Sequence, residues 1–137
     1  MNTNLKGNIA LGKAIAYFTE QEFIVNLPLN DSQCYDFIIE KNGKMQTVQV
    51  KYTSEQAPSG NYVCHLRTVS GTTRTSLYNI TDTYCDLLFC YCSNGDKFLI
   101  PVKEINNNST LTLYREKSKF ASKNTMDSSQ YLIELGE

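Results

Sequence analysis

The sequence predicts an α/β domain in which one amphipathic helix precedes a set of β-strands. Two observations support this prediction. Residues 5–18 place apolar side chains at the period of a helix, and residues 35–52 contain two strand-like runs joined by Asn42-Gly43, the strongest short signal for a β-hairpin. Further strand-like runs follow at 62–68, 86–92 and 97–102.

The composition is that of one folded domain. The chain has 137 residues, of which 41% are hydrophobic and 20% charged, so its apolar side chains can offset the entropy lost on folding. No apolar run approaches the roughly 20 residues of a membrane span, and the polar start of the chain is unlike a signal peptide. We expect a cytoplasmic protein with a single domain over 1–137 and a polar C-terminal extension from about residue 115.

The first predicted element is the helix over 5–18. Asn4 or Thr3 is expected to cap its start, and a short strand over 23–27 follows and ends at Pro28. The apolar stripe of the helix contains Leu5, Ile9, Leu11, Ile15 and Phe18.

The hairpin turn fixes a register for the two strands beside it. A two-residue turn pairs the lysines on either side of it, and by extension Asp36 faces Gln49. Because side chains alternate along a strand, Lys51 lies on the same face as Gln49. This polar face is predicted to bring a carboxylate, an amide and an amine together. The opposite face is predicted to be apolar, with Tyr35, Phe37, Ile39, Val48 and Val50.

The second half of the chain is predicted to be less regular. A polar loop over 69–76 and a short helix over 75–83 are expected before the next strands. A last strand is expected at 111–114. The tail beyond residue 117 is polar and partly irregular until a short apolar run at 131–133.

The cysteines do not have the spacing of a zinc site. No CxxC pair is present, and the one histidine, His65, lies within a strand-like run. We therefore expect buried, inert thiols and a structural role for His65. The cysteines are Cys34, Cys64, Cys85, Cys90 and Cys92.

Charge is nearly balanced overall but segregated along the chain. The formal net charge is −1, which argues against indiscriminate binding to polyanions. Bases outnumber acids within 41–75 and 115–123, whereas 82–96 contains acids and no base. Positive segments on a near-neutral protein are compatible with a local nucleic-acid-binding face and equally with solvated surface charge.

The polar face of the hairpin has the chemistry of a metal-dependent hydrolase. A carboxylate and carbonyl oxygens suit Mg²⁺, which prefers hard oxygen ligands. A nearby ammonium can orient or deprotonate a water that attacks a phosphodiester, and it can stabilise charge that develops on the phosphate. As bare spacing the trio of Asp36, Gln49 and Lys51 is a weak signal, because polar groups also gather on ordinary half-exposed hairpins.

Three segments of the chain carry a family resemblance: 6–10 (Lys-Gly-Asn-Ile-Ala), 36–39 (Asp-Phe-Ile-Ile) and 48–53 (Val-Gln-Val-Lys-Tyr-Thr). They resemble the PD-(D/E)XK nucleases, in particular the homing endonucleases of that superfamily encoded within cyanobacterial group I introns. The resemblance is strong over roughly 5–53 and looser to about 114. It implies a restriction-endonuclease-like α/β core, with a mixed central sheet flanked by helices, and magnesium-dependent cleavage of double-stranded DNA.

The resemblance also implies roles for single residues. Asp36 would bind the metal, together with Gln49 and the backbone carbonyl of Val50, and Lys51 would be the motif lysine. Gln49 departs from the usual Asp or Glu but matches the homing subgroup, and its neutral oxygen should hold metal more weakly. Leu11 stands where relatives have a glutamate that helps to hold metal and water. This departure raises the hypothesis of an inactivated variant, natural or engineered.

DNA contacts are expected from the positive segments and the hydroxyl-rich loop. A chain of this size has room for one nuclease site, so cutting both strands requires a homo-oligomer, either a dimer or a tetramer. The candidate DNA-binding residues are Lys13, Arg67, Thr72, Thr73, Arg74, Arg115, Lys117 and Lys119.

Two other functions fit the same sequence. A structure-selective nuclease, such as a Holliday junction resolvase, shares this core and would cut four-way junctions rather than one long duplex site. A DNA-binding module that kept the fold but lost catalysis would bind duplex DNA with Mg²⁺ and leave it uncut. Leu11 and Gln49 favour this last alternative.

Overall fold

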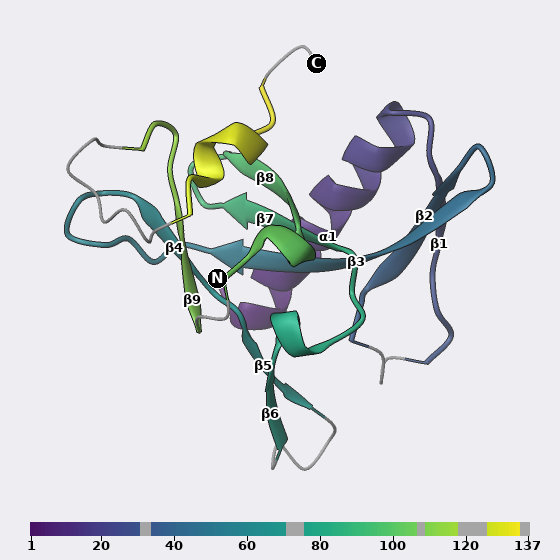
Figure 1. Ribbon diagram of the computed structural model, residues 1–137, viewed down its shortest axis with the longest axis horizontal. Coiled ribbons are helices and arrows are strands. Elements are labelled where there is room, and N and C mark those ends of the chain that lie inside the picture. The colour runs from purple at the N-terminus through teal and green to yellow at the C-terminus, as the bar shows by residue number, and fades with distance from the viewer. Residues whose placement is uncertain (31–33, 71–75, 107–108, 118–125, 135–137) are drawn as a thin grey trace.

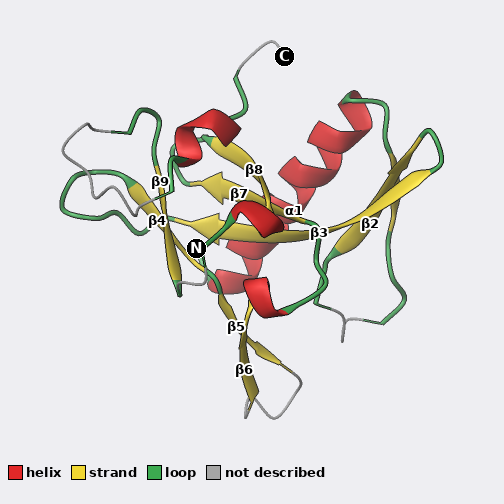
Figure 2. Cartoon of the chain, viewed as in Figure 1, coloured by secondary structure: helices red, strands yellow, loops and turns green. Residues whose placement is uncertain are grey.

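A mixed five-stranded sheet with the strand order β1-β2-β3-β7-β8 forms the centre of the protein (Figure 1). The computed structural model describes residues 1–30, 34–70, 76–106, 109–117 and 126–134. One long helix, α1, packs on one face of this sheet (Figure 2). The α/β class with a mixed sheet is therefore confirmed, although α1 is the only α-helix among the described residues. The elements are α1 (Thr3–Glu20), β1 (Ile24–Asn26), β2 (Phe37–Lys41), β3 (Lys44–Thr53), β4 (Tyr62–His65), β5 (Arg67–Ser70), β6 (Ser76–Asn79), β7 (Leu87–Cys92), β8 (Lys97–Pro101), β9 (Thr110–Leu113) and three 3₁₀ turns, η1 (Ile80–Asp82), η2 (Val102–Glu104) and η3 (Ser128–Tyr131).

α1 begins earlier than predicted because Asn2, rather than Asn4 or Thr3, caps it. The Asn2 side-chain oxygen accepts a hydrogen bond of 2.9 Å from the N–H of Leu5. Three side chains of α1 are buried, those of Ala10, Ala14 and Phe18. The two alanines are small and let the helix backbone approach the sheet.

The predicted hairpin register is confirmed, and the pairing of β2 with β3 runs from the turn to Phe37 opposite Val48. Asn42 and Gly43 have φ angles of 54° and 79°, the left-handed conformations that a type I′ turn requires. Beyond Val48, β3 continues to Thr53 and pairs in parallel with β7 on its other side. No described strand pairs with the opposite edge of this second half of β3.

Apolar clusters cover both faces of the central sheet. On the α1 face, the rings of Phe18 and Phe37 lie 5.8 Å apart, and Val48 and Phe89 complete a buried cluster. On the opposite face a second cluster unites β7 and β8 with β4, β9 and the 3₁₀ turns. The face predicted to be polar is therefore also covered by apolar residues, and Gln49 on this face is only 8% exposed.

Tyr35 was predicted to share a face with Phe37, and this prediction is wrong. Tyr35 packs against the cluster on the face away from α1, and its ring lies 6.2 Å from that of Tyr84. Phe37, Ile39 and Val48 do lie in the α1-face cluster, as expected from strand alternation.

The run predicted as one strand over 62–68 forms two strands in different sheets. β4 pairs with β9, and β5 pairs with β6 in a hairpin that projects away from the central sheet (Figure 1). Between them, Leu66 is fully buried, and its N–H and C=O bond to Ser109 and Ile80. Residues 75–83, predicted as a helix, instead contain strand β6 and the single turn η1.

The cysteines and the C-terminal segment complete the core. Cys64, Cys85, Cys90 and Cys92 are buried and free, as predicted, and Cys34 is half-buried. The end of the described chain is more ordered than expected, because the hydroxyl of Ser128 accepts a hydrogen bond from the N–H of Tyr114 and donates one to a carbonyl of β9.

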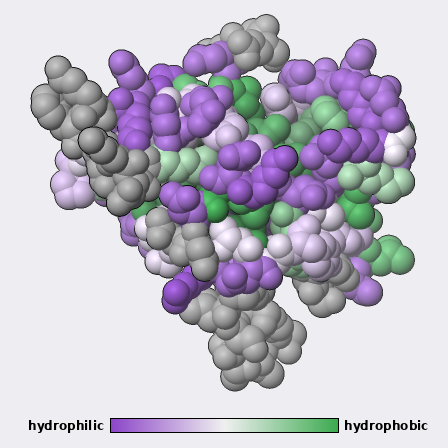
Figure 3. All heavy atoms as spheres, in the orientation of Figure 1, coloured by the Kyte–Doolittle hydropathy of each residue, from purple (hydrophilic) through white to green (hydrophobic). Residues whose placement is uncertain are grey.

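The face of the protein shown in Figure 3 is largely polar. Hydrophilic side chains cover much of the face seen in Figure 3, with apolar residues between them. His65 is exposed rather than buried in the core, and its ring is 2.8 Å from the carboxylate of Glu55. Within the described ranges, no helix is long and apolar enough to cross a membrane.

Candidate functional site

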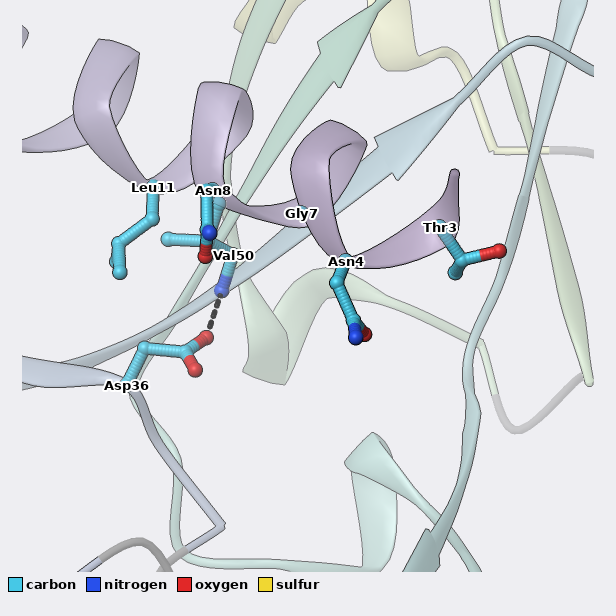
Figure 4. A pocket seen from close by; sticks show the side chains of 7 residues that line it. All are labelled: Thr3, Asn4, Gly7, Asn8, Leu11, Asp36 and Val50. Carbon is cyan, nitrogen blue, oxygen red and sulfur yellow. Dashed lines mark hydrogen bonds between the residues drawn. The ribbon is translucent and has the colours of Figure 1, made fainter. Parts of the chain in front are cut away.

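Asp36 occupies the open edge of β3, just before β2 begins. Its N–H donates a 2.8 Å hydrogen bond to the carbonyl of Val48. Val48 is also the ladder partner of Phe37. It therefore faces two consecutive residues, Asp36 and Phe37, as in a β-bulge. The carboxylate of Asp36 accepts a 2.6 Å hydrogen bond from the N–H of Val50 (Figure 4). Asp36 therefore bonds to Val50 and does not simply face Gln49 across the ladder, as the register alone predicts.

The second half of β3 surrounds Asp36 with oxygen and nitrogen groups. In an extended strand the N–H and C=O of one residue point to the same side, so the carbonyl of Val50 lies at the edge that Asp36 occupies. The side chains of Gln49 and Lys51 project from the sheet face opposite α1, because Val50 packs on the α1 face. Lys51 is half-buried, and its charge acts on Asp36.

Gln49 carries an unusual polar atom. Its side-chain oxygen is buried and has no hydrogen-bond partner in the described part of the chain. A buried acceptor without a partner costs about 1–3 kcal/mol, so a ligand for this oxygen would remove an energetic penalty. The oxygens of Asp36, Gln49 and Val50 are hard donors of the kind that Mg²⁺ prefers. The residues present therefore fit a magnesium ion.

The charge available to such an ion is small. Among the described residues, no group of three or more His, Cys, Asp or Glu side chains is arranged so that it could hold a metal ion. Desolvation by the surrounding protein raises the pKa of Asp36 above its ordinary value, although the hydrogen bond from Val50 and the charge of Lys51 act in the opposite direction. A metal would thus rest on one carboxylate and on neutral oxygens.

α1 forms the other wall of the site. A cavity of about 510 Å³ opens between this helix and Asp36, and Figure 4 shows the amides of Asn4 and Asn8 extending from α1 toward the side where Asp36 lies. Leu11 is half-buried and lines the same cavity. The cavity is lined by Thr3, Asn4, Gly7, Asn8, Leu11, Asp36 and Val50.

Sequence analysis missed Asn4 and Asn8. The signal that could have found them is their spacing with Leu11, because positions i, i+4 and i+7 share one face of a helix.

The predicted DNA-binding residues are dispersed, and none of the described ones lines this cavity. The ammonium of Lys13 lies 6.0 Å from the ring centre of Tyr91, and Arg67 is exposed on β5. The guanidinium of Arg115 lies 3.2 Å from the carboxylate of Asp96. Lys117 is half-buried. Thr72, Thr73, Arg74 and Lys119 lie outside the described residues.

Comparison with known proteins agrees with this geometry. Residues 1–131 match the family model described as PD-(D/E)XK endonuclease. The chain is also similar to the structure of a bacterial homing endonuclease, I-Ssp6803I, with 28% sequence identity and a TM-score of 0.74, over 96% of this chain and 89% of that chain. No curated protein matches the sequence significantly. Because the family model spans nearly the whole chain, the protein belongs to the PD-(D/E)XK endonuclease family and is a DNA endonuclease.

Proposed function

We propose that this chain is a sequence-specific, Mg²⁺-dependent endonuclease that cuts double-stranded DNA as a homo-oligomer and serves in intron homing. The observation that carries the proposal is the buried side-chain oxygen of Gln49, which has no partner among the described residues and belongs to the strand that Asp36 contacts. The similarity to a structure titled as a bacterial homing endonuclease supports the homing role.

The residues of the site would have different roles in phosphodiester hydrolysis. Asp36, Gln49 and the carbonyl of Val50 would hold the metal ion, which would polarise the phosphate and lower the pKa of a bound water. Lys51 would stabilise the negative charge that develops on the phosphate and would orient the attacking water. The charge of Lys51 acts on the carboxylate of Asp36, which supports a place for the ammonium in this site.

A cleavage-site selection tests the proposed function. A pool of random duplex DNA is incubated with the protein and Mg²⁺, and the cut ends are sequenced, with a parallel reaction that contains a chelator. We expect cuts at one related set of sequences with Mg²⁺ and none with the chelator. Cleavage of four-way junctions but not of duplexes would instead identify a junction-resolving nuclease.

A second candidate function is a DNA-binding protein with impaired catalysis. The observation in its favour is that Leu11, an apolar side chain, lines the same cavity as Asp36. In that case the protein would shift a defined duplex in a gel-shift titration with Mg²⁺, and the cleavage-site selection would yield no cut ends.

A further inference from the structure

Two glycines interrupt the interior of α1 without a visible structural reason. Glycine destabilises a helix interior relative to alanine, because it loses more backbone freedom on folding. Neither Gly7 nor Gly12 has a positive φ angle. A Cβ atom added at either position would meet no atom within 4 Å. Packing within the chain and backbone conformation therefore require glycine at neither position.

The two positions differ in what they face. Gly7 lines the cavity beside Asp36, and Gly12 does not. Asn4 and Asn8 lie on either side of Gly7 along α1 and line the same cavity (Figure 4). The missing side chain at Gly7 thus leaves open space in the helix wall that also carries these two amide groups, within the cavity that Asp36 lines.

The chemistry of this wall suits a phosphate group. Amide NH₂ groups donate hydrogen bonds to phosphate oxygens, and protein–DNA interfaces use such contacts to position the duplex. Asp36 is the only acid that lines the cavity in the described chain, so the helix wall itself adds no negative charge that would repel a phosphate. Neutral donors also leave Asp36 free for a cation.

We propose that Gly7 is a positioning residue, whose missing side chain admits a phosphate of the DNA backbone between the amides of Asn4 and Asn8. This inference rests on the proposed function, since it takes DNA as the ligand of the same cavity. A methyl group at position 7 fills the opening and holds the phosphate away from α1. The same methyl group at position 12 stands in open solvent.

A pair of matched variants, Gly7→Ala and Gly12→Ala, tests this inference. Both are expected to raise the midpoint of thermal unfolding by similar amounts, because both replace a helical glycine. Only Gly7→Ala is expected to weaken binding to a fluorescent pool of random duplex DNA, measured by anisotropy with Ca²⁺ as the cation. The expected loss is roughly tenfold, the equivalent of about one hydrogen bond to a charged group. Single-turnover cleavage in Mg²⁺ should fall in the same variant.

The outcomes separate the inference from the proposed function. If Gly7→Ala binds and cleaves DNA like Gly12→Ala, the inference is wrong while the nuclease function stands. If the wild type cuts no duplex but Gly7→Ala still weakens DNA binding, the inference of a phosphate contact at Gly7 is supported and the proposed nuclease function of this chain is wrong. If Gly7→Ala lowers the unfolding midpoint while Gly12→Ala raises it, Gly7 has a structural role within the helix and the inference is overturned.

Discussion

Single residues limit the charge of the active site. Asp36 is the one acid that lines the described cavity. Leu11 lines it as well, and Gln49 belongs to the strand whose backbone Asp36 contacts. A neutral amide oxygen and a leucine bring no negative charge to a metal ion. Substitutions at these few positions therefore test the mechanism more directly than changes elsewhere.

Lys51→Ala is expected to lower cleavage by about 10²–10³-fold and to leave specific binding nearly unchanged, because the ammonium acts on the reacting phosphate whereas affinity is spread over many phosphate contacts. Single-turnover cleavage and a gel-shift titration measure the two effects. Lys44→Ala, at an exposed position beside the hairpin turn, is the control and should change neither. Unchanged cleavage by Lys51→Ala would remove this residue from the mechanism.

Leu11→Glu is expected to raise Mg²⁺-dependent cleavage, roughly tenfold or more, since it adds a carboxylate to a site that has one. Thermal stability should stay equal or fall, because a carboxylate beside an apolar cluster is desolvated unless a cation or Lys51 pairs with it. Leu11→Gln is the matched control, with a similar shape and no charge. A Leu11→Glu protein that unfolds early and cleaves no better would refute the assignment of this position to the site.

The raised pKa of Asp36 predicts a pH-dependent difference between the wild type and Asp36→Asn. A raised pKa means that the folded protein holds the proton more tightly than the unfolded chain, so stability from this group is greatest below 3.8 and is lost as the pH rises through the folded-state value. At neutral pH, Asp36→Asn should therefore be the more stable protein. Thermal unfolding of both proteins, measured from neutral pH down to a pH below 3.8, gives the difference in stability. This difference should shrink as the pH falls, and a difference that stays constant would contradict the prediction.

At the scale of elements, β3 positions the site because its two halves have different neighbours. Its first half pairs with β2 on one edge, and its second half pairs only with β7 among the described strands. The edge that β2 leaves open receives the carboxylate of Asp36. The site therefore depends on where the hairpin stops pairing and on the register of the hairpin, which the turn at its other end sets.

Gly43→Ala is expected to destabilise the protein by about 1–2 kcal/mol, because Gly43 has a φ angle of 79° and a Cβ atom is strained in that conformation. Urea unfolding of the variant and the wild type gives this difference. Lys97→Ala, at the start of β8 and away from the turn, provides a reference for an ordinary substitution. A Gly43→Ala protein as stable as the wild type would show that the type I′ turn does not hold the register.

At the scale of the whole molecule, the size of the chain predicts assembly. One nuclease site cannot make a coordinated double-strand break, so we expect sedimentation at a mass above that of one 15.5 kDa chain, with or without DNA. Tyrosines are common at protein interfaces, and the sequence offers Tyr78, Tyr84 and Tyr91 as candidate anchors. Tyr84 is 67% exposed, Tyr91 is half-buried against Tyr52, and the side chain of Tyr78 is outside the described residues. A sedimentation mass of one chain at micromolar concentration would refute assembly.

The sequence by itself determined the elements that short-range rules control. The helical period placed α1 to within a few residues, and Asn42-Gly43 set the register from the turn to Phe37. These features depend on interactions between residues a few positions apart, so the order of side chains along the chain is sufficient to specify them. The prediction of a nuclease site came from the resemblance of segments in this helix and this hairpin to a nuclease family.

Only the tertiary structure decided how the two faces of the sheet are covered and how the site is completed. The parallel pairing of β3 with β7, the burial of Gln49, the turn of the chain at Leu66 and the amides of Asn4 and Asn8 beside Asp36 were not predicted. Each depends on segments that are distant in sequence and meet because they bury apolar surface together. Strand alternation tells which side chains share a face, but what covers that face depends on packing.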